Sequence, residues 1–256
     1  MERNIKLTVA YDGTAYHGFQ RQANGITIQE ILEGRLSVIF GHPVKIIGSG
    51  RTDSGVHAYG QVINFLTMGK IPMAKILQAV NGILPPDIVV VSAEEAAPDF
   101  HARRSAKSKT YIYRIYNAQL RSPFERHHSW HVRGDLNVSL MDKIVQQVVG
   151  THDFSAFRAA GGAPVSPVKS IYQAYCRKDA AIVNFSFNGS GFLYHMVRNL
   201  VGTIVEIGLG RRQPDEFSVI LAGLDRKKAG ITAPPEGLYL MSVQYEKPEI
   251  SPGAEL

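Results

Sequence analysis

The chain has almost no cysteine, and it lacks any hydrophobic run long enough to span a membrane. Cys176 is the single cysteine among 256 residues, which excludes an intramolecular disulfide and a cysteine-rich metal site. A membrane helix needs about 20 consecutive apolar residues, and the first residues lack the apolar core of a signal peptide. We therefore expect a cytoplasmic protein that does not associate with membranes. Its hydrophobic content of 45% is sufficient for a globular core.

Several motifs that carry cofactor or hydrolase chemistry are also missing. The chain contains no G-x-G-x-x-G that opens a helix, no G-K-[ST] and no G-x-S-x-G, so nucleotide cofactors and serine hydrolase chemistry are disfavoured. His57, His101 and His195 are not accompanied by a second ligand at metal-binding spacing, so packing or hydrogen bonding is the expected role of each. We expect neither a cofactor nor a metal.

Positive charge is in excess and is concentrated in one segment. The formal net charge is +6 and the pI is about 9.4, values typical of proteins that bind polyanions such as nucleic acids. Residues 100–124 carry six Lys or Arg, three Tyr and no acid. Basic groups contact phosphates and aromatic rings stack on bases, so this segment is a candidate RNA-binding stretch. A strand edge kept positive against aggregation is the alternative.

The first part of the chain predicts alternating strands and helices. Thr27 and Glu30 form a capping box at the start of a helix that Gly41 ends. The expected elements are a strand at 5–11, this helix, strands at 43–49 and 60–67, a helix at 72–81 with Asn81-Gly82 as its C-cap, and a strand at 87–93. Their order, βαββαβ, is that of a ferredoxin-like domain.

The second part predicts the same order with insertions. The expected elements are a strand at 110–117, a helix introduced by Asn137 or Ser139, a hairpin of strands at 169–177 and 181–188, helices at 192–207 and from Pro214, and a strand at 238–245. We therefore predict an α+β fold of two ferredoxin-like halves, residues 1–104 and 105–256. Their sheets are expected to join edge to edge into a largely antiparallel sheet with a central catalytic cleft.

Asp53 is the first candidate for a reacting group. It lies in the segment Arg51 to Val56, in a glycine-flanked turn between the two predicted strands at 43–49 and 60–67. A loop positioned by a rigid sheet is the usual place for a reacting side chain. A polar turn, in which the carboxylate only accepts local hydrogen bonds, is the alternative.

Arg198 is the second candidate. The helix that contains it is apolar nearly all round, which predicts burial. A buried guanidinium needs a carboxylate or phosphate partner because it cannot lose its proton. The acids that could pair with it are Glu206, Asp215 and, across the expected cleft, Asp53.

Long motifs that include these two residues resemble the tRNA pseudouridine synthase A family. Phe19 stands where the family more often has tryptophan, and Ser54 where it more often has alanine. The five resembling segments are YDGTAYHGFQ (11–20), GSGRTDSGVHAYGQV (48–62), FHARRSAKSKTYIYRI (100–115), GSGFLYHMVRNLVG (189–202) and APPEGLYL (233–240).

The resemblance implies the pseudouridine synthase fold and a homodimer that isomerises uridines 38, 39 and 40 of the tRNA anticodon stem-loop. Asp53 matches the catalytic aspartate, Arg198 the active-site arginine, and Tyr111 the tyrosine that stacks on the target uracil. Arg51, Thr52, His57 and Leu238 are the implied substrate-binding residues. Candidates for the RNA backbone contacts are Arg21, Arg103, Arg104, Arg211 and Arg212.

Two other classes of protein remain as alternatives. An RNA-binding protein without activity fits the two ferredoxin-like halves, but the chain has no RNP1 strand, and a mere binder would have no use for Asp53 and Arg198 together. A glycosidase usually needs two facing carboxylates, and no second acid stands out. The residues alone do not decide whether the carboxylate attacks C1′ or C6 or assists loss of a ribose proton.

Overall fold

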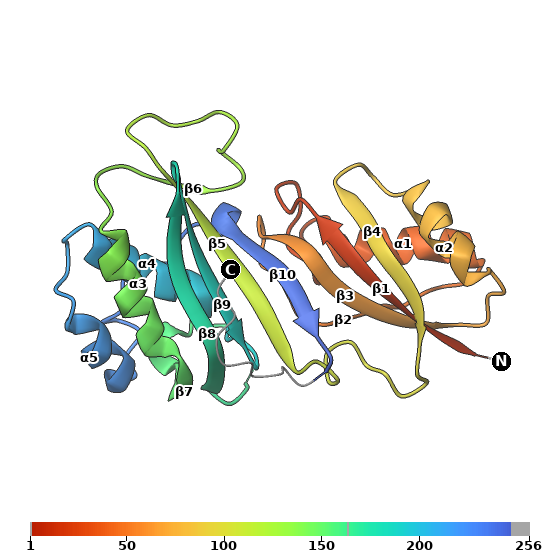
Figure 1. The fold of residues 1–256 in the computed structure, drawn as a ribbon. Helices are drawn as coiled ribbons and strands as arrows, with labels where there is room; N and C mark the ends of the chain where they lie inside the picture. Colours follow the sequence, from red (N-terminus) through yellow and green to blue (C-terminus); the bar gives the residue numbers. More distant parts are fainter. Residues whose placement is uncertain (1, 163, 247–256) are drawn as a thin grey trace.

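The computed structural model describes residues 2–162 and 164–246, and within them ten strands form one sheet (Figure 1). The sheet is antiparallel except for two pairs, and Figure 1 shows α1, α2 and α4 behind it. The strands are β1 Arg3–Tyr11, β2 Ile47–Gly48, β3 His57–Thr67, β4 Ile88–Ala96, β5 Ser108–Asn117, β6 Trp130–Val132, β7 Gly150–Asp153, β8 Val168–Asp179, β9 Ile182–Gly189 and β10 Leu238–Gln244.

Five α-helices and three short 3-10 helices complete the described part of the chain, and the α-helices are α1 Ile28–Phe40, α2 Met73–Asn81, α3 Val138–Val145, α4 Met196–Gly208 and α5 Glu216–Gly223. The Thr27 hydroxyl accepts the N–H of Glu30, and Gly41 ends α1 in the left-handed conformation at φ 72°, as predicted. Asn137 caps α3. Among these residues, no helix is long and apolar enough to cross a membrane.

The two halves repeat one strand order. The sheet runs β4-β1-β3-β10-β5-β9-β8-β7, so β4-β1-β3 and β10-β5-β9 are equivalent triplets. They meet through a short parallel pairing of β3 with β10, in which Tyr239 lies opposite His57 and Leu240 opposite Ala58. The predicted α+β fold, with two βαββαβ halves joined edge to edge in a largely antiparallel sheet, is confirmed.

Two details of the prediction are wrong. The strand expected at 43–49 is only β2, Ile47–Gly48, because the backbone N–H groups of Val44 and Ile46 donate to Ser37 and Glu33 of α1 instead of a neighbouring strand. The short strands β6 and β7 were not predicted, since three or four residues show too little alternation.

Buried hydrophobic side chains of both halves form the core. Tyr113, Phe185 and Phe187 are fully buried in the second half, and Ile5, Leu7 and Phe65 in the first. This packing makes the joined sheet a rigid support for the loops and helix ends described next.

Candidate active site

The loop that carries Asp53 connects β2 to β3 and is fixed by neighbours on both sides. The N–H of Val56 donates to the Asp53 carbonyl, and Gly55 has a φ of 76°, which closes a tight turn. Thr52 is buried: its hydroxyl bonds the Tyr11 hydroxyl at 2.7 Å, and its carbonyl accepts the N–H of Phe19. The Asp53 side chain is 23% exposed. A rigid backbone therefore presents a carboxylate that solvent and substrate can reach.

Arg198 meets this carboxylate from the second half. It lies in the first turn of α4, and its side chain is 11% exposed. Its Nη1 donates to Asp53 Oδ2 at 3.2 Å and its Nε to the carbonyl of Ala233 at 2.7 Å. The alternative partner Glu206 is instead paired with Arg212. The expected contact across the two halves is thus present, and it buries the guanidinium with two acceptors.

His195 is a second neighbour of Asp53 that the sequence did not reveal. Its Nε2 lies 3.2 Å from the same oxygen, Asp53 Oδ2. Burial lowers the pKa of His195, although the Asp53 charge opposes the shift. No residue in the described part of the chain bonds Asp53 Oδ1. Arg198 and His195 therefore hold one carboxylate oxygen and leave the other for a substrate.

The backbone of His195 explains how its ring reaches the site. It precedes α4 with a φ of 58°, a left-handed conformation that is uncommon for residues with a side chain. Its ring lies on that of Tyr194, with centroids 3.9 Å apart. In the sequence, only the position of His195 three residues before Arg198 indicates that it belongs to the site. A left-handed backbone at a histidine cannot be read from the sequence.

Tyr111 and Leu238 form an apolar side of the same cleft, which has a volume of about 990 Å³. Tyr111 is 8% exposed and meets Phe192 edge to face, with centroids 5.0 Å apart. Burial raises the pKa of the Tyr111 hydroxyl above its ordinary value. Val56, Leu193 and Val197 add further apolar lining next to Asp53.

Basic side chains surround the cleft. Lys109 was not singled out for the site, yet its Nζ donates to the Ser49 carbonyl at 2.7 Å. Burial, with a contribution from the charge of Arg103, lowers the pKa of Lys109 to about 8. The basic residues that line the cleft are Arg21, Arg51, Arg103, Lys109 and Arg158.

Five predicted site residues do not line the cleft, although one of them, Arg198, reaches the site through its contact with Asp53. Arg104, Arg211 and Arg212 are not among its lining residues. Arg212 forms ion pairs with Glu206 and Glu216. His57 lies in a second pocket with Tyr239. Side chains alternate along a strand and Tyr239 lies opposite His57, so both side chains point to the face opposite Leu238, and the predicted substrate-binding residue His57 does not line the cleft.

Comparisons with known proteins decide the family. The model of the tRNA pseudouridine synthase family matches residues 7–105 and 144–246. The chain belongs to this family. It is 46% identical over 243 residues to tRNA pseudouridine synthase A of Thermoanaerobacter sp. (strain X514), covering 95% of this chain and all of that protein. It is 48% identical over 245 residues to the protein of the same name from Ruminiclostridium cellulolyticum, with the same coverage.

Among solved structures, a chain of a Cbf5-Nop10-Gar1 complex is a distant match. The TM-score is 0.40 at 11% identity, over 92% of this chain and 48% of that chain. The family assignment rests on the sequence relatives and on the family model.

Proposed function

We propose that this protein is a tRNA pseudouridine synthase that converts uridines 38, 39 and 40 of the anticodon stem-loop to pseudouridine without a cofactor. The observation that carries the proposal is the 3.2 Å contact across the two halves between Arg198 and Asp53, because Asp53 lines a cleft together with basic residues. Both residues lie in segments that the family model matches. An RNA-binding protein without activity would not need this ion pair.

The reaction needs a carboxylate with one available oxygen. The N1–C1′ bond of uridine breaks, the uracil turns while held, and a C5–C1′ bond forms while the proton leaving C5 is balanced by one gained at N1. Asp53 serves this sequence by attack at C1′, by attack at C6, or by assisting loss of a ribose proton. In each case Oδ1 reacts while Arg198 and His195 hold Oδ2.

The apolar side of the cleft suits a detached or turning uracil. Tyr111 and Leu238 line the cleft together with Asp53, and the Tyr111 ring offers a face on which a base stacks. The raised pKa of Tyr111 keeps its hydroxyl protonated at neutral pH, so it is able to donate a hydrogen bond. Thr52 holds the Asp53 loop in place through the hydrogen bond between its hydroxyl and the Tyr11 hydroxyl.

A uridine paired in a stem must leave the helix to reach Asp53. Arg51 is exposed on the same loop and lines the cleft, where it either fills the vacated space or binds a phosphate. Arg21, Arg103 and Lys109 supply further positive charge along the cleft. We assign the enzyme to the cytoplasm as a homodimer with residues 1–104 and 105–256 as its domains, and the tRNA is expected to lie across both subunits.

Asp53→Asn tests the function because it removes the charge and keeps the shape of the side chain. With unmodified tRNA, the wild-type protein is expected to form pseudouridine at positions 38–40, and the variant to lose at least about 10³-fold in rate, a loss typical for a reacting group. Asp99→Asn is the matched control, since Asp99 is an exposed acid outside the cleft. Thermal unfolding and tRNA binding should be nearly unchanged in both variants.

The products separate the three classes of protein. No pseudouridine with tRNA otherwise bound would favour the non-catalytic RNA-binding protein. Release of free uracil would indicate a glycosidase. Near wild-type turnover in Asp53→Asn would refute the assignment of Asp53.

A further inference from the structure

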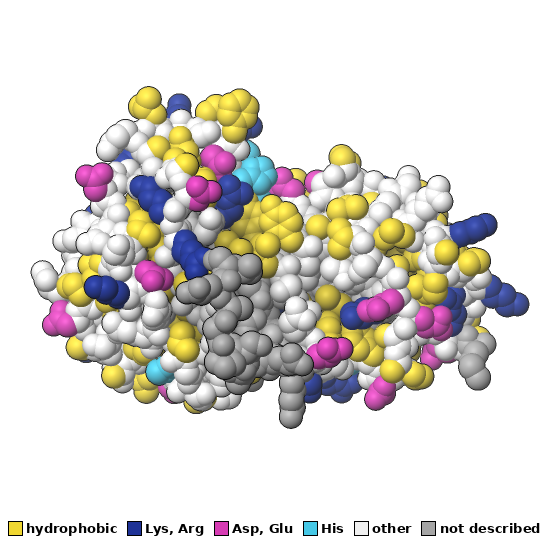
Figure 2. All heavy atoms as spheres, in the orientation of Figure 1, with side chains coloured by type: hydrophobic (Ala, Val, Ile, Leu, Met, Phe, Trp, Pro, Cys, Tyr) yellow, Lys and Arg dark blue, Asp and Glu magenta, His cyan; other side chains and the backbone are white. Residues whose placement is uncertain are grey.

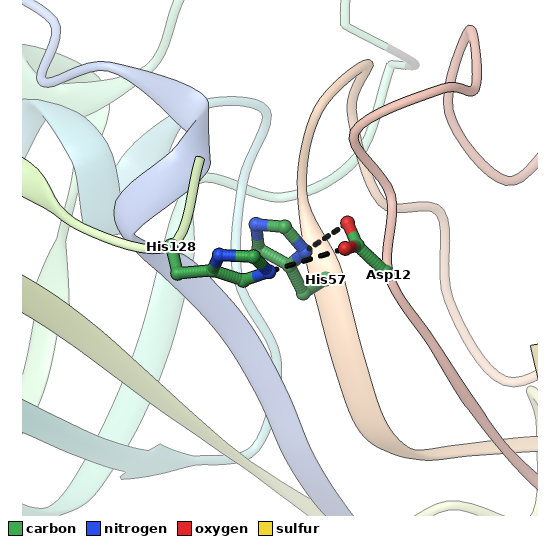
Figure 3. A group of neighbouring side chains, drawn as sticks. All are labelled: Asp12, His57 and His128. Atoms are coloured by element: carbon green, nitrogen blue, oxygen red, sulfur yellow. Dashed lines mark hydrogen bonds and ion pairs between the residues drawn. The ribbon is translucent and has the colours of Figure 1, made fainter. Parts of the chain in front are cut away.

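Asp12, His57 and His128 form a cluster away from the cleft (Figure 3). Asp12 follows β1, His57 begins β3, and His128 lies in the connection between β5 and β6 of the second half. His57 Nδ1 is 3.1 Å from Asp12 Oδ1, and His128 Nε2 is 3.1 Å from Asp12 Oδ2. The function proposed above uses none of these three side chains.

The distances match those of ligands that share one metal ion. The candidate ligand atoms all lie within 4.8 Å of one another. Two atoms bound to one zinc ion at about 2.0–2.1 Å and at a tetrahedral angle are about 3.3 Å apart. The two contacts of 3.1 Å are close to this value, so small movements would bring the atoms to bonding distance.

The surroundings of His57 indicate that its Nδ1 carries the lone pair. The N–H of Gly13 donates to Nδ1 at 3.1 Å. The buried Nε2 has no hydrogen-bond partner in the described residues, so Nδ1 is the ring nitrogen that faces the cluster. With the proton on Nε2, the Asp12 oxygen faces an unprotonated nitrogen. A cation between these two atoms would convert that repulsion into two bonds, at the cost of the Gly13 hydrogen bond.

The cluster is accessible to an ion from solvent. The three residues line a pocket of about 260 Å³. His57 is 2% exposed, whereas the Asp12 and His128 side chains are 38% and 43% exposed. Figure 2 shows a histidine next to acidic side chains at the upper centre of the face that α1, α2 and α4 do not cover. An ion held here would keep an open position for water.

We propose that Asp12, His57 and His128 bind one divalent transition-metal ion of the zinc class. Two imidazoles and a carboxylate are the donor set that suits zinc and its neighbours, and the absence of a nearby thiolate disfavours copper(I). The ion links the connection between β5 and β6, which contains His128, to the end of β1 and the start of β3 in the first half. The Tyr239 hydroxyl already donates to the His128 carbonyl at 2.7 Å, and the Tyr239 ring stacks on His57, so the ion completes an existing junction.

Calorimetric titration of the chelator-treated protein with Zn²⁺, in the absence of tRNA, tests the site. One ion per chain is expected to bind, and His128→Ala should weaken binding by at least about tenfold because it removes one ligand. His127→Ala is the matched control, since this exposed histidine is the chain neighbour of His128 and is not in the cluster. Asp12→Asn should weaken binding as well.

Co²⁺ gives a second readout that does not depend on affinity. Visible absorption of a four- or five-coordinate ion is expected with the wild-type protein and should be lost in His128→Ala. Asp53→Asn should bind Zn²⁺ as the wild type does, so a failure of the proposed enzyme function would leave this result unchanged. The proposal is overturned if binding is not saturable at one ion per chain, or if His127→Ala weakens it as much as His128→Ala.

Discussion

Tyr111 is placed to hold the target base by its ring, so its two simplest substitutions should differ. Tyr111→Phe keeps the ring that meets Phe192 and should retain kcat/KM within about threefold. Tyr111→Ala removes the stacking face, and a base–aromatic stack contributes about 1–3 kcal/mol, or roughly 5–150-fold in kcat/KM. Single-turnover rates on an anticodon stem-loop would measure both.

The phenylalanine variant decides the role of the hydroxyl. If Tyr111→Phe were as impaired as Tyr111→Ala, the hydroxyl would take part in proton transfer and stacking would be secondary. The apparent affinity for RNA should fall only in the alanine variant.

At the level of single residues, the sequence predicted the members of the site that have an unusual chemical setting. Arg198 stood out as a charge in an apolar helix, and Asp53 as an acid in a glycine-flanked turn. His195 and Lys109 did not stand out, because a left-handed backbone and a partly buried ammonium group become visible only in three dimensions. His57, a predicted substrate-binding residue, lies in a second pocket and not in the cleft lining, because a motif does not show to which face of a strand a side chain points.

At the level of elements, the start of α4 combines strain with a contact to the reacting carboxylate. His195 has a φ of 58° and places Nε2 3.2 Å from Asp53 Oδ2. His195→Ala and His195→Gly both remove the ring, but only glycine adopts this backbone conformation without cost. We expect the glycine variant to be more stable than the alanine variant by about 1 kcal/mol. Both should lose at least about tenfold in turnover.

Denaturant unfolding and single-turnover kinetics of the two variants test this pairing of strain and function. Equal stability would show that the left-handed conformation is not strained. Wild-type turnover in either variant would remove His195 from the site. His195→Asn, which tolerates the left-handed conformation, is a useful third variant.

Element order was predictable because most helices and strands carry clear periodicity. The capped helix α1 and the apolar helix α4 were both expected, although α4 begins at Met196 and not at residue 192. The expected strand at 43–49 failed because two of its backbone N–H groups bond side chains of α1. Periodicity describes which side chains are apolar, and it does not describe the partner of each backbone group.

At the level of the whole molecule, the positions of the basic side chains define the expected RNA footprint. Arg103 lines the cleft, whereas Arg211 is exposed beyond the end of α4 and outside the cleft lining. Each phosphate contact adds about 0.9 to the slope of log affinity against log salt concentration on a duplex, and about 0.7 on a single strand. Arg103→Ala should therefore reduce this slope by nearly one, and Arg211→Ala should leave it unchanged. Filter binding of tRNA across a salt series would measure both.

A slope that falls in Arg211→Ala and stays unchanged in Arg103→Ala would place the RNA-binding surface at the end of α4. An unchanged slope in both variants would indicate that neither side chain meets a phosphate. The sequence alone ranked these two arginines equally, because the count of basic residues carries no information on which of them share a cleft.

Lys109 couples the charge of the cleft to pH. Burial lowers its pKa to about 8 from 10.5, so the ammonium group is charged at pH 7 and largely neutral at pH 9. If Lys109 contacts a phosphate, tRNA binding should weaken as pH rises through about 8. The slope of log affinity against log salt concentration should then fall by nearly one. Lys109→Arg stays charged over this range and should remove the pH dependence.

The free protein should respond with the opposite sign. Between pH 8 and 10.5 the unfolded chain still binds the proton that folded Lys109 has lost, so the free energy of unfolding should rise with pH through this window. Lys109→Met should flatten that rise, because it removes the titrating group from both states. Affinity that falls while stability rises therefore identifies Lys109 as a partly buried ammonium group that meets phosphate. Affinity that does not change between pH 7 and 9 in the wild type would mean that Lys109 only holds the Ser49 carbonyl, through the 2.7 Å bond that anchors the Asp53 loop.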